Sequence, residues 1–402
     1  MSFNITLAAI LLGGWLFSRI FSMLRLPNIL GMVVFGILAG AFASPLIPPL
    51  LWEVEPMLKS LALVVILLRA GLGLSKATLK KTGVTALLMA VIPCLFEGAA
   101  LTLLFHWMFG FDWNVSGLTA FMISAVSPAV IVPSMLNLKE RGYGEQKGVP
   151  SIVLAGASVD DVLAITLFSV FLGLARTGET QVATSLLSVP LSIGGGIALG
   201  AILGWLMSAW FQKRHESLRA TEKMLLLLVG AVFLVQLGEV LHSATLLGVM
   251  TVGFVLLERA EKAAHELAKK LSKVWIFAEI ILFVLIGLSV DVPTALGAGL
   301  KGLAVISLGL VFRSLGVLVA TMGSPLNQKE RWFCVIAYLP KATVQAALGG
   351  VALQNSVAQG EVILALAVLS ILFTAPLGLV GIKVFGKRLL DLPFEESQEN
   401  PQ

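Results

Sequence analysis

Charged side chains are scarce in this sequence. Of its 402 residues, only 13% are Asp, Glu, Lys or Arg, about half of the roughly 25% that is usual in soluble domains. Hydrophobic residues make up 57% and fall in long runs separated by short polar breaks. This composition excludes an ordinary soluble protein. It predicts an all-helical protein that crosses the lipid bilayer many times.

Cysteine is also rare, and the two thiols, Cys94 and Cys334, lie in apolar stretches without the spacing of metal ligands. A disulfide framework and a redox centre are therefore not expected. The sequence also lacks a nucleotide-binding loop, a cluster of transition-metal ligands and a nucleophile motif. We expect a transporter and not an enzyme, with no cofactor. The net charge of +5 does not indicate nucleic acid as a partner, because most basic residues lie in short loops where they orient membrane helices.

Apolar runs of spanning length predict thirteen transmembrane helices. Their ranges are 5–22, 28–44, 57–74, 83–107, 114–137, 149–174, 183–211, 221–241, 243–258, 272–290, 295–322, 330–353 and 361–386. The first run lacks the basic start of a signal peptide, so we expect it to be retained. Lys and Arg gather mainly at the ends of odd-numbered helices, which predicts an outside N-terminus and a cytoplasmic C-terminus. We expect an integral protein of a bacterial inner membrane.

The two halves of the chain resemble each other. LGMVVFG at 30–36 matches LGVMTVG at 247–253, LGLS at 72–75 matches IGLS at 286–289, and SPAVIVP at 127–133 aligns with LPKATVQ at 339–345. These matches predict a first repeat at 1–182, a linker helix and loop at 183–220, a second repeat at 221–390 and a cytoplasmic tail at 391–402. Each unit has six helices, and a single linker helix separates the two units. The second unit therefore starts from the opposite side of the membrane and is inverted relative to the first. Inverted repeats are typical of secondary transporters.

Prolines interrupt two corresponding helices. Pro128 and Pro133 flank an apolar AVIV segment, and Pro340 lies inside the matching run of the second repeat, directly before Lys341. Proline removes a backbone donor and clashes with the preceding turn. Broken helices at membrane depth are tolerated where protein or a water-filled cavity satisfies the freed backbone groups. Paired breaks of this kind indicate a binding site between the repeats.

Two adjacent aspartates, Asp160 and Asp161, stand in the apolar stretch GASVDDVLAIT. A carboxylate at mid-membrane costs about 2.5–3.5 kcal/mol even on the lowest scale, and such groups usually have a function. Neighbouring positions on a helix point about 100° apart, so we expect the two carboxylates to have separate partners. We assign Asp161 as the main carrier of an alkali cation and a proton in turn, with Asp160 beside it.

Hydroxyl groups near the breaks and the aspartates are candidate supporting ligands for such a cation, although hydroxyls in membrane helices more often bond to backbone. They belong to Ser127, Ser134, Ser158, Thr166 and Thr343. The remaining charges inside predicted spans include Glu97 and Arg313, which occupy nearly equivalent repeat positions. We expect them to form a structural ion pair that joins the two halves, with a role in proton coupling as the alternative. Arg69 is expected at a helix end or in a cavity, and the segment 258–273 as a surface connector.

Four motifs resemble those of monovalent cation:proton antiporters, especially the sodium/proton exchangers with paired aspartates. They are PSIVLAGASVDDVLAIT, AVSPAVIVPSML, YLPKATVQAALG and LRLPNILGMVVFGILAG. The resemblance implies crossed broken helices in a mobile core that moves against a dimerisation scaffold, and hence a homodimer. It also implies that Asp160 pairs with Lys341, that Asp161 faces an aqueous cavity, and that sodium or lithium exchanges for protons by alternating access.

Other functions stay open at this point. A potassium/proton antiporter would share the same framework. A sodium-coupled symporter of an organic anion is disfavoured because no second cationic pocket is apparent, and a channel because no repeated filter is present. The charge balance of the cycle also depends on Lys341. If this lysine loses its proton during exchange, two protons move per sodium and the cycle is electrogenic, which the buried charges favour; if not, exchange is electroneutral.

Overall fold

The computed structural model describes residues 2–73, 76–177, 182–214, 217–241 and 245–391. Within these ranges the regular elements are all helices, and ten helices are long and apolar enough to cross a membrane. The three other predicted spans correspond to the 15-residue α10 and to two helices that break in the middle. The protein is therefore an all-helical integral membrane protein, and the count of thirteen spans stays a prediction.

The helices follow one another with short connections. In chain order they are α1 (Phe3–Met23), α2 (Asn28–Ala43), η1 (Ser44–Leu46), α3 (Pro49–Gly73), α4 (Lys76–Leu104), η2 (Phe105–Phe109), α5 (Trp113–Ser124), α6 (Pro128–Glu140), α7 (Val149–Thr177), α8 (Val182–Lys213), α9 (Ala220–Leu241), α10 (Thr245–Arg259), α11 (Glu261–Leu288), α12 (Val292–Ala320), α13 (Gln328–Ala337), α14 (Thr343–Leu348), α15 (Val351–Gln354) and α16 (Gly360–Leu389).

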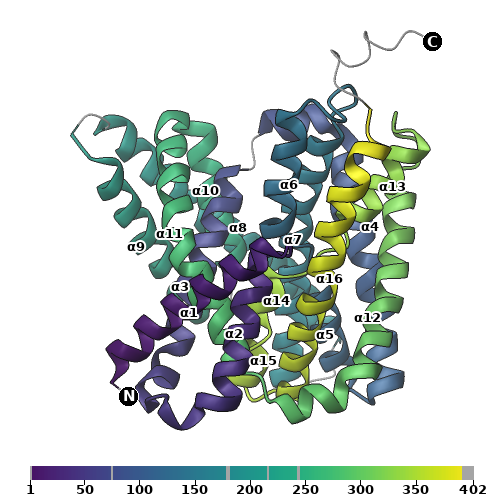
Figure 1. Ribbon diagram of the computed structural model, residues 1–402. Coiled ribbons are helices and arrows are strands. Elements are labelled where there is room, and N and C mark those ends of the chain that lie inside the picture. Colours follow the sequence, from purple (N-terminus) through teal and green to yellow (C-terminus); the bar gives the residue numbers. More distant parts are fainter. Residues whose placement is uncertain (1, 74–75, 178–181, 215–216, 242–244, 392–402) are drawn as a thin grey trace.

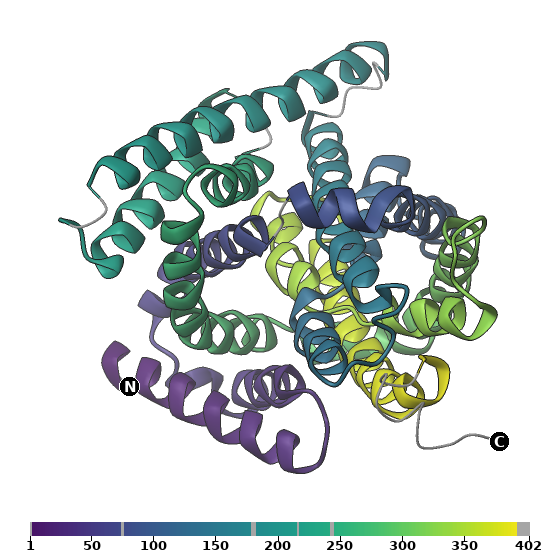
Figure 2. The same cartoon turned by 90° about the horizontal axis from the view of Figure 1, so that it is seen from above.

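Two groups of helices lie side by side (Figures 1 and 2). The scaffold group consists of α1–α3 and α8–α11, and the site group consists of α4–α7 and α12–α16. Helices pack mainly within their own group, through pairs such as α8 with α10 and α4 with α12. Each group therefore combines helices from both halves of the sequence.

Glycines of the repeated motifs allow two helix pairs of the scaffold group to touch backbone to backbone. Where α2 meets α11, a methyl group added to Gly36 would lie 2.9 Å from the Cα atom of Gly287. Where α3 meets α10, one added to Gly71 would lie 3.1 Å from the Cα atom of Gly253. Small residues permit this close approach in membrane helices. Gly36 and Gly253 are the last glycines of LGMVVFG and LGVMTVG, so the two sequence halves form the same kind of contact twice.

Both predicted broken helices are discontinuous. Residues 125–127 separate α5 from α6, which begins at Pro128, and residues 338–342 separate α13 from α14 around Pro340. Helix α6 continues through Pro133. The two breaks touch, because the Ser127 N–H donates to the carbonyl of Pro340 at 2.9 Å. We call residues 125–127 and 338–342 together the crossing.

Most of the predicted surface connector at 258–273 is helical, because α11 begins at Glu261. Its sequence alternates charged residues with apolar ones at helical spacing. Ala263, Ala264, Leu267 and Leu271 are buried, and they place one apolar stripe against the bundle. The charged side chains between them remain on the outer face of the helix.

Candidate cation site at the crossing of the broken helices

The carbonyl end of α5 is capped by the side chain of Gln345. A helix that ends inside the protein leaves its last carbonyl groups without partners. The Gln345 amide nitrogen donates to the carbonyl oxygens of Met122, Ile123 and Ala125, at 2.9, 3.1 and 2.9 Å. Since these acceptors surround the nitrogen, the amide oxygen must point the other way. That oxygen is buried and has no hydrogen-bond partner among the described residues.

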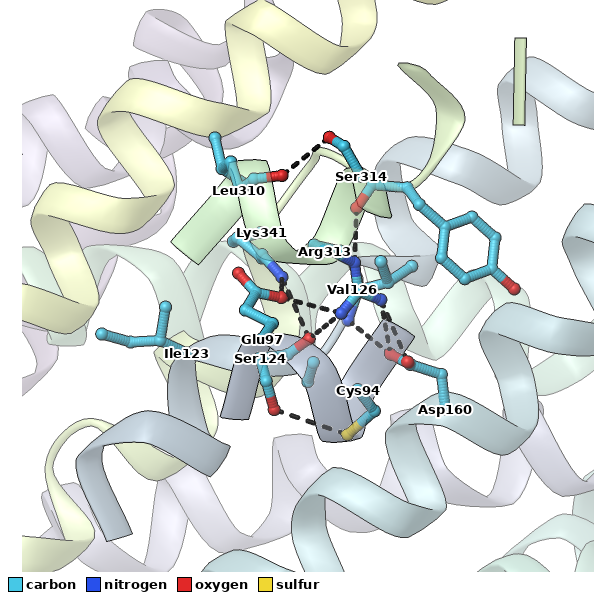
Figure 3. A network of polar contacts seen from close by, with 12 residues as sticks. Cys94, Glu97, Ile123, Ser124, Val126, Asp160, Leu310, Arg313, Ser314 and Lys341 are labelled. Carbon is cyan, nitrogen blue, oxygen red and sulfur yellow. Dashed lines mark hydrogen bonds and ion pairs between the residues drawn. The ribbon is translucent and has the colours of Figure 1, made fainter. Parts of the chain in front are cut away.

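Arg313 holds together four groups from different elements (Figure 3). Its guanidinium is fully buried and donates to Glu97 on α4 at 2.8 Å and to both carboxylate oxygens of Asp160 on α7 at 3.0 Å. The same side chain donates to the carbonyls of Ser124, at the end of α5, and Tyr338, at the end of α13. Arg313 therefore ties the C-terminal ends of both broken helices to two carboxylates.

Lys341 has a different partner from the expected one. Its ammonium group donates to Glu97 at 2.6 Å and to the Ser124 carbonyl at 3.0 Å. No hydrogen bond or ion pair joins Lys341 to Asp160 in the part of the chain that is described, because Arg313 occupies both oxygens of Asp160. The structure thus brings Glu97 and Arg313 together as the repeat positions indicated, and replaces the Asp160–Lys341 pair by two pairs, Asp160 with Arg313 and Lys341 with Glu97.

The Oδ2 atom of Asp160 also contacts the backbone of the first break. It accepts the backbone N–H of Val126, in the first break, at 3.0 Å. In the second break, the backbone N–H of Lys341 donates to the Thr374 hydroxyl on α16 at 2.8 Å. Each of these bonds satisfies a backbone N–H in one of the two breaks. In each, a long helix supplies the oxygen that satisfies a broken helix, so Asp160 is a member of the framework.

Asp161, in contrast, is 5% exposed, and its Oδ1 atom is buried without a hydrogen-bond partner among the described residues. The hydroxyls of Ser127 and Thr343, at the crossing, are buried and unpartnered in the same way. A buried acceptor without a partner costs about 1–3 kcal/mol. Oxygen atoms held in this condition suit a ligand that supplies positive charge.

The other predicted ligands are placed less favourably. Ser134 donates to the Val130 carbonyl of its own helix at 2.8 Å. Thr166 is buried on α7, five positions after Asp161. Ser158 also lies on α7, but its side chain is outside the described part of the structure.

A cavity of about 1280 Å³ opens between the scaffold group and the site group. Its walls come from α3 and α11 on one side and from α6, α7 and α16 on the other. It reaches Val130 in the first turn of α6 and Ala155 on α7, and Ser134 lines it. Asp161 is not among the lining residues, and its access to an aqueous cavity, which the sequence motifs implied, stays a prediction.

A family model described as "Sodium/hydrogen exchanger, transmembrane" matches residues 7–387. The chain belongs to this family. It is 35% identical over 396 residues to sodium/hydrogen exchanger 9B2 of Mus musculus, covering 94% of this chain and 71% of the relative. It is 32% identical over 394 residues to sodium/hydrogen exchanger 9B1 of Homo sapiens, covering 93% and 74%. Members of this family are transporters, so the predicted resemblance to cation:proton antiporters is confirmed.

Two solved structures have a similar fold. The sodium proton antiporter MjNhaP1 from Methanocaldococcus jannaschii, in a structure at pH 8, has a TM-score of 0.76 at 21% identity, covering 95% of each chain. A second structure of MjNhaP1 has a TM-score of 0.78 at 20% identity, covering 100% of each chain. At these identities the likeness shows the fold, and it confirms the predicted sodium/proton antiporter architecture.

The cap on α5 gives a testable expectation. Replacing Gln345 by methionine keeps the length of the side chain but removes the donor for three carbonyls. Leaving a buried acceptor unpaired costs about 1–3 kcal/mol, so we expect a clearly lower midpoint of thermal unfolding in detergent. Gln354→Met is the matched control, because Gln354 is exposed at the end of α15. Equal midpoints for the two variants would contradict the capping role.

Proposed function

We propose that this protein exchanges sodium or lithium for protons by alternating access, with Asp161 as the carboxylate that binds the cation and the proton in turn. The observation that carries the proposal is the contrast between the two aspartates. Asp160 is fully engaged with Arg313 and a backbone amide, whereas Asp161 has an unpartnered buried oxygen. A carboxylate without a fixed partner can accept either ligand, and occupancy by one excludes the other.

The atoms near the crossing support an alkali cation as the substrate. Small hard cations prefer oxygen ligands, and the unpartnered buried atoms of Asp161, Ser127 and Thr343 are all oxygens. Half-helix ends and unwound backbone commonly complete such sites in transporters. The positive charges of Arg313 and Lys341 are already matched by Glu97 and Asp160, so they do not oppose a cation at Asp161 as free charges would.

Alternating access is supported by the position of the cavity between the two helix groups. The site group would move against the scaffold group, so that the crossing is reached from one side of the membrane at a time. The cavity mouth carries basic residues at the ends of α6 and α16, which by the positive-inside rule is the cytoplasmic side. The division into repeats, the orientation of the termini, the homodimer and a bacterial origin stay predictions.

Proton-driven dye assays in proteoliposomes test this function. A pH gradient quenches the dye, and addition of sodium or lithium should restore its fluorescence over a range of pH values. Recovery with potassium at equal strength would favour the potassium/proton alternative. The absence of recovery with all three cations would contradict exchange.

The ion pairs also revise the expected charge balance. The electrogenic cycle required the cation to release Lys341 from Asp160, but Lys341 is bonded to Glu97 and Asp160 to Arg313. We infer that Asp161 alone changes its protonation, so that one proton exchanges for one cation. The expected result is that a sodium jump on a solid-supported membrane gives no sustained transport current, although the same vesicles show exchange by dye. A sustained current that follows the imposed voltage would refute the one-for-one cycle.

A further inference from the structure

Most of the charged side chains that line the large cavity are basic. Four basic side chains stand at its mouth, and we call them the basic rim: Lys139, Arg141, Lys383 and Lys387. Arg69 on α3 also lines the cavity, and among the described side chains of the lining Glu279 is the single acidic one. A concave surface with this excess of positive charge attracts anions. From the sequence, the four rim residues were expected to orient membrane helices, Arg69 was expected at a helix end or in a cavity, and no second cationic pocket was apparent.

Arg69 is the most informative of these charges because it lies in a membrane span. It belongs to α3, is half-buried, and stacks over the Trp275 ring with 5.6 Å between its Cζ atom and the ring centroid. No hydrogen bond joins its guanidinium to any described residue, although Glu279 is close enough to interact with it electrostatically, and its N–H donors can reach a further acceptor. Arg69 lies four residues before Gly73, the last residue of α3, so its guanidinium is near the end of the span. A guanidinium with free donors matches phosphate geometry.

The basic rim comes from two helix ends that pack together. Lys383 and Lys387 are one turn apart on α16, and therefore on one face. Gly386 lies between them, and a methyl group there would be 3.2 Å from the Leu138 side chain on α6, next to Lys139. All four rim residues are exposed and belong to the site group, whereas Arg69 belongs to the scaffold group. An anion held by both sets of charges would bridge the two groups.

The rest of the cavity wall is apolar. It includes Leu26, Ile29, Ile66, Val130, Leu154 and Ile382. At about 1280 Å³, the cavity exceeds the roughly 300–1,000 Å³ that is usual for small-molecule sites. Positive charge at the mouth and an apolar interior together match a molecule with an anionic head and a hydrocarbon chain.

We propose that this cavity is a binding site for an amphiphilic phosphate, with the head between the basic rim and Arg69 and the alkyl chain along the apolar wall. The bound molecule holds the two helix groups in the arrangement described here, so it inhibits the exchange cycle. The proposal of binding depends only on the shape and charge of the cavity. The proposal of inhibition also depends on the proposed exchange function.

Thermal unfolding of the purified protein in a nonionic detergent measures binding without transport. Dodecyl phosphate should raise the unfolding midpoint in a concentration-dependent way, as a ligand of the folded state does. In the variant Lys383→Gln/Lys387→Gln, the half-saturating concentration should rise about tenfold, since two exposed charge contacts contribute up to about 1 kcal/mol each. The matched control, Lys213→Gln/Arg388→Gln, removes two exposed charges from outside the cavity and should behave like the unaltered protein.

Two further ligands make the result decisive. Dodecyltrimethylammonium has the same chain with the opposite charge and should not stabilise the protein. Inorganic phosphate lacks the chain and should require much higher concentrations. An equal effect of dodecyltrimethylammonium, an equal effect of inorganic phosphate, or identical half-saturation in the two double variants would overturn the proposal.

Transport then tests inhibition. In phosphatidylcholine proteoliposomes, dodecyl phosphate should slow sodium/proton exchange by the unaltered protein, relative to its own uninhibited rate, and should affect the Lys383→Gln/Lys387→Gln variant much less. If the protein shows no exchange but dodecyl phosphate still stabilises it, the proposed function fails while the binding site stands. If exchange occurs and both proteins respond equally to dodecyl phosphate, the inhibitory site is refuted.

Discussion

Replacing Asp161 by asparagine is expected to reduce sodium-dependent proton exchange to the background of empty liposomes while the protein stays folded. Asparagine has nearly the same shape, but it can neither carry the negative charge nor take up the proton. Because Asp161 Oδ1 has no hydrogen-bond partner among the described residues, the substitution removes no bond of that atom to the framework. Dye dequenching measures the loss, and the unfolding midpoint in detergent should stay within a few degrees.

The neighbouring substitution, Asp160→Asn, is the matched control for this prediction. It should lower the unfolding midpoint strongly, because it takes the charge from the group that Arg313 and the Val126 N–H both contact. Robust exchange by Asp161→Asn would refute the assignment of the carrier. An unchanged midpoint for Asp160→Asn would contradict its place in the framework.

Replacing Arg313 by methionine should produce the largest loss of stability in the molecule. Breaking a buried ion pair by removing one partner typically costs about 3–5 kcal/mol, and this side chain also donates to the carbonyls of Ser124 and Tyr338. We expect a large fall in the unfolding midpoint and in the yield of folded protein. Arg176→Met serves as a control, since Arg176 is exposed near the end of α7.

The double variant Glu97→Gln/Arg313→Met sharpens this test. Residues that share a network show coupling energies of about 0.5–3 kcal/mol. The double variant should therefore lose less stability than the two single variants lose together. In the double variant Glu97 no longer remains as a buried charge that has lost Arg313. Additive losses would argue against energetic coupling between these two side chains.

Several features were predictable from residues because they follow from local chemistry or from the repeat. Pro128 and Pro340 marked the breaks, since proline cannot continue a helix without loss. The contact between Glu97 and Arg313 followed from their equivalent positions in an inverted repeat. The choice of partner for Lys341 could not be read in this way, because one guanidinium with several donors competes for every carboxylate within reach.

Two other features were missed for reasons that the structure makes clear. Gln345 received no role, although an amide just after a proline break in an apolar run was a usable signal that freed carbonyls needed a donor. The basic rim was attributed to orientation alone, because a linear sequence shows which residues flank a helix but not which ones face a common cavity.

The glycine contacts within the scaffold group have a mechanical consequence. Where α2 meets α11 and α3 meets α10, backbone lies directly on backbone, and no flexible side chain stands between the helices to absorb a displacement. Sliding one helix along the other by a few ångströms would bring a β-carbon against a carbonyl, so these pairs resist shear. Relative motion is then confined to the boundary where side chains of the two groups meet. The scaffold group should therefore move as a rigid unit. The backbone amides at its glycine contacts should exchange with deuterium more slowly than the amides that face the cavity.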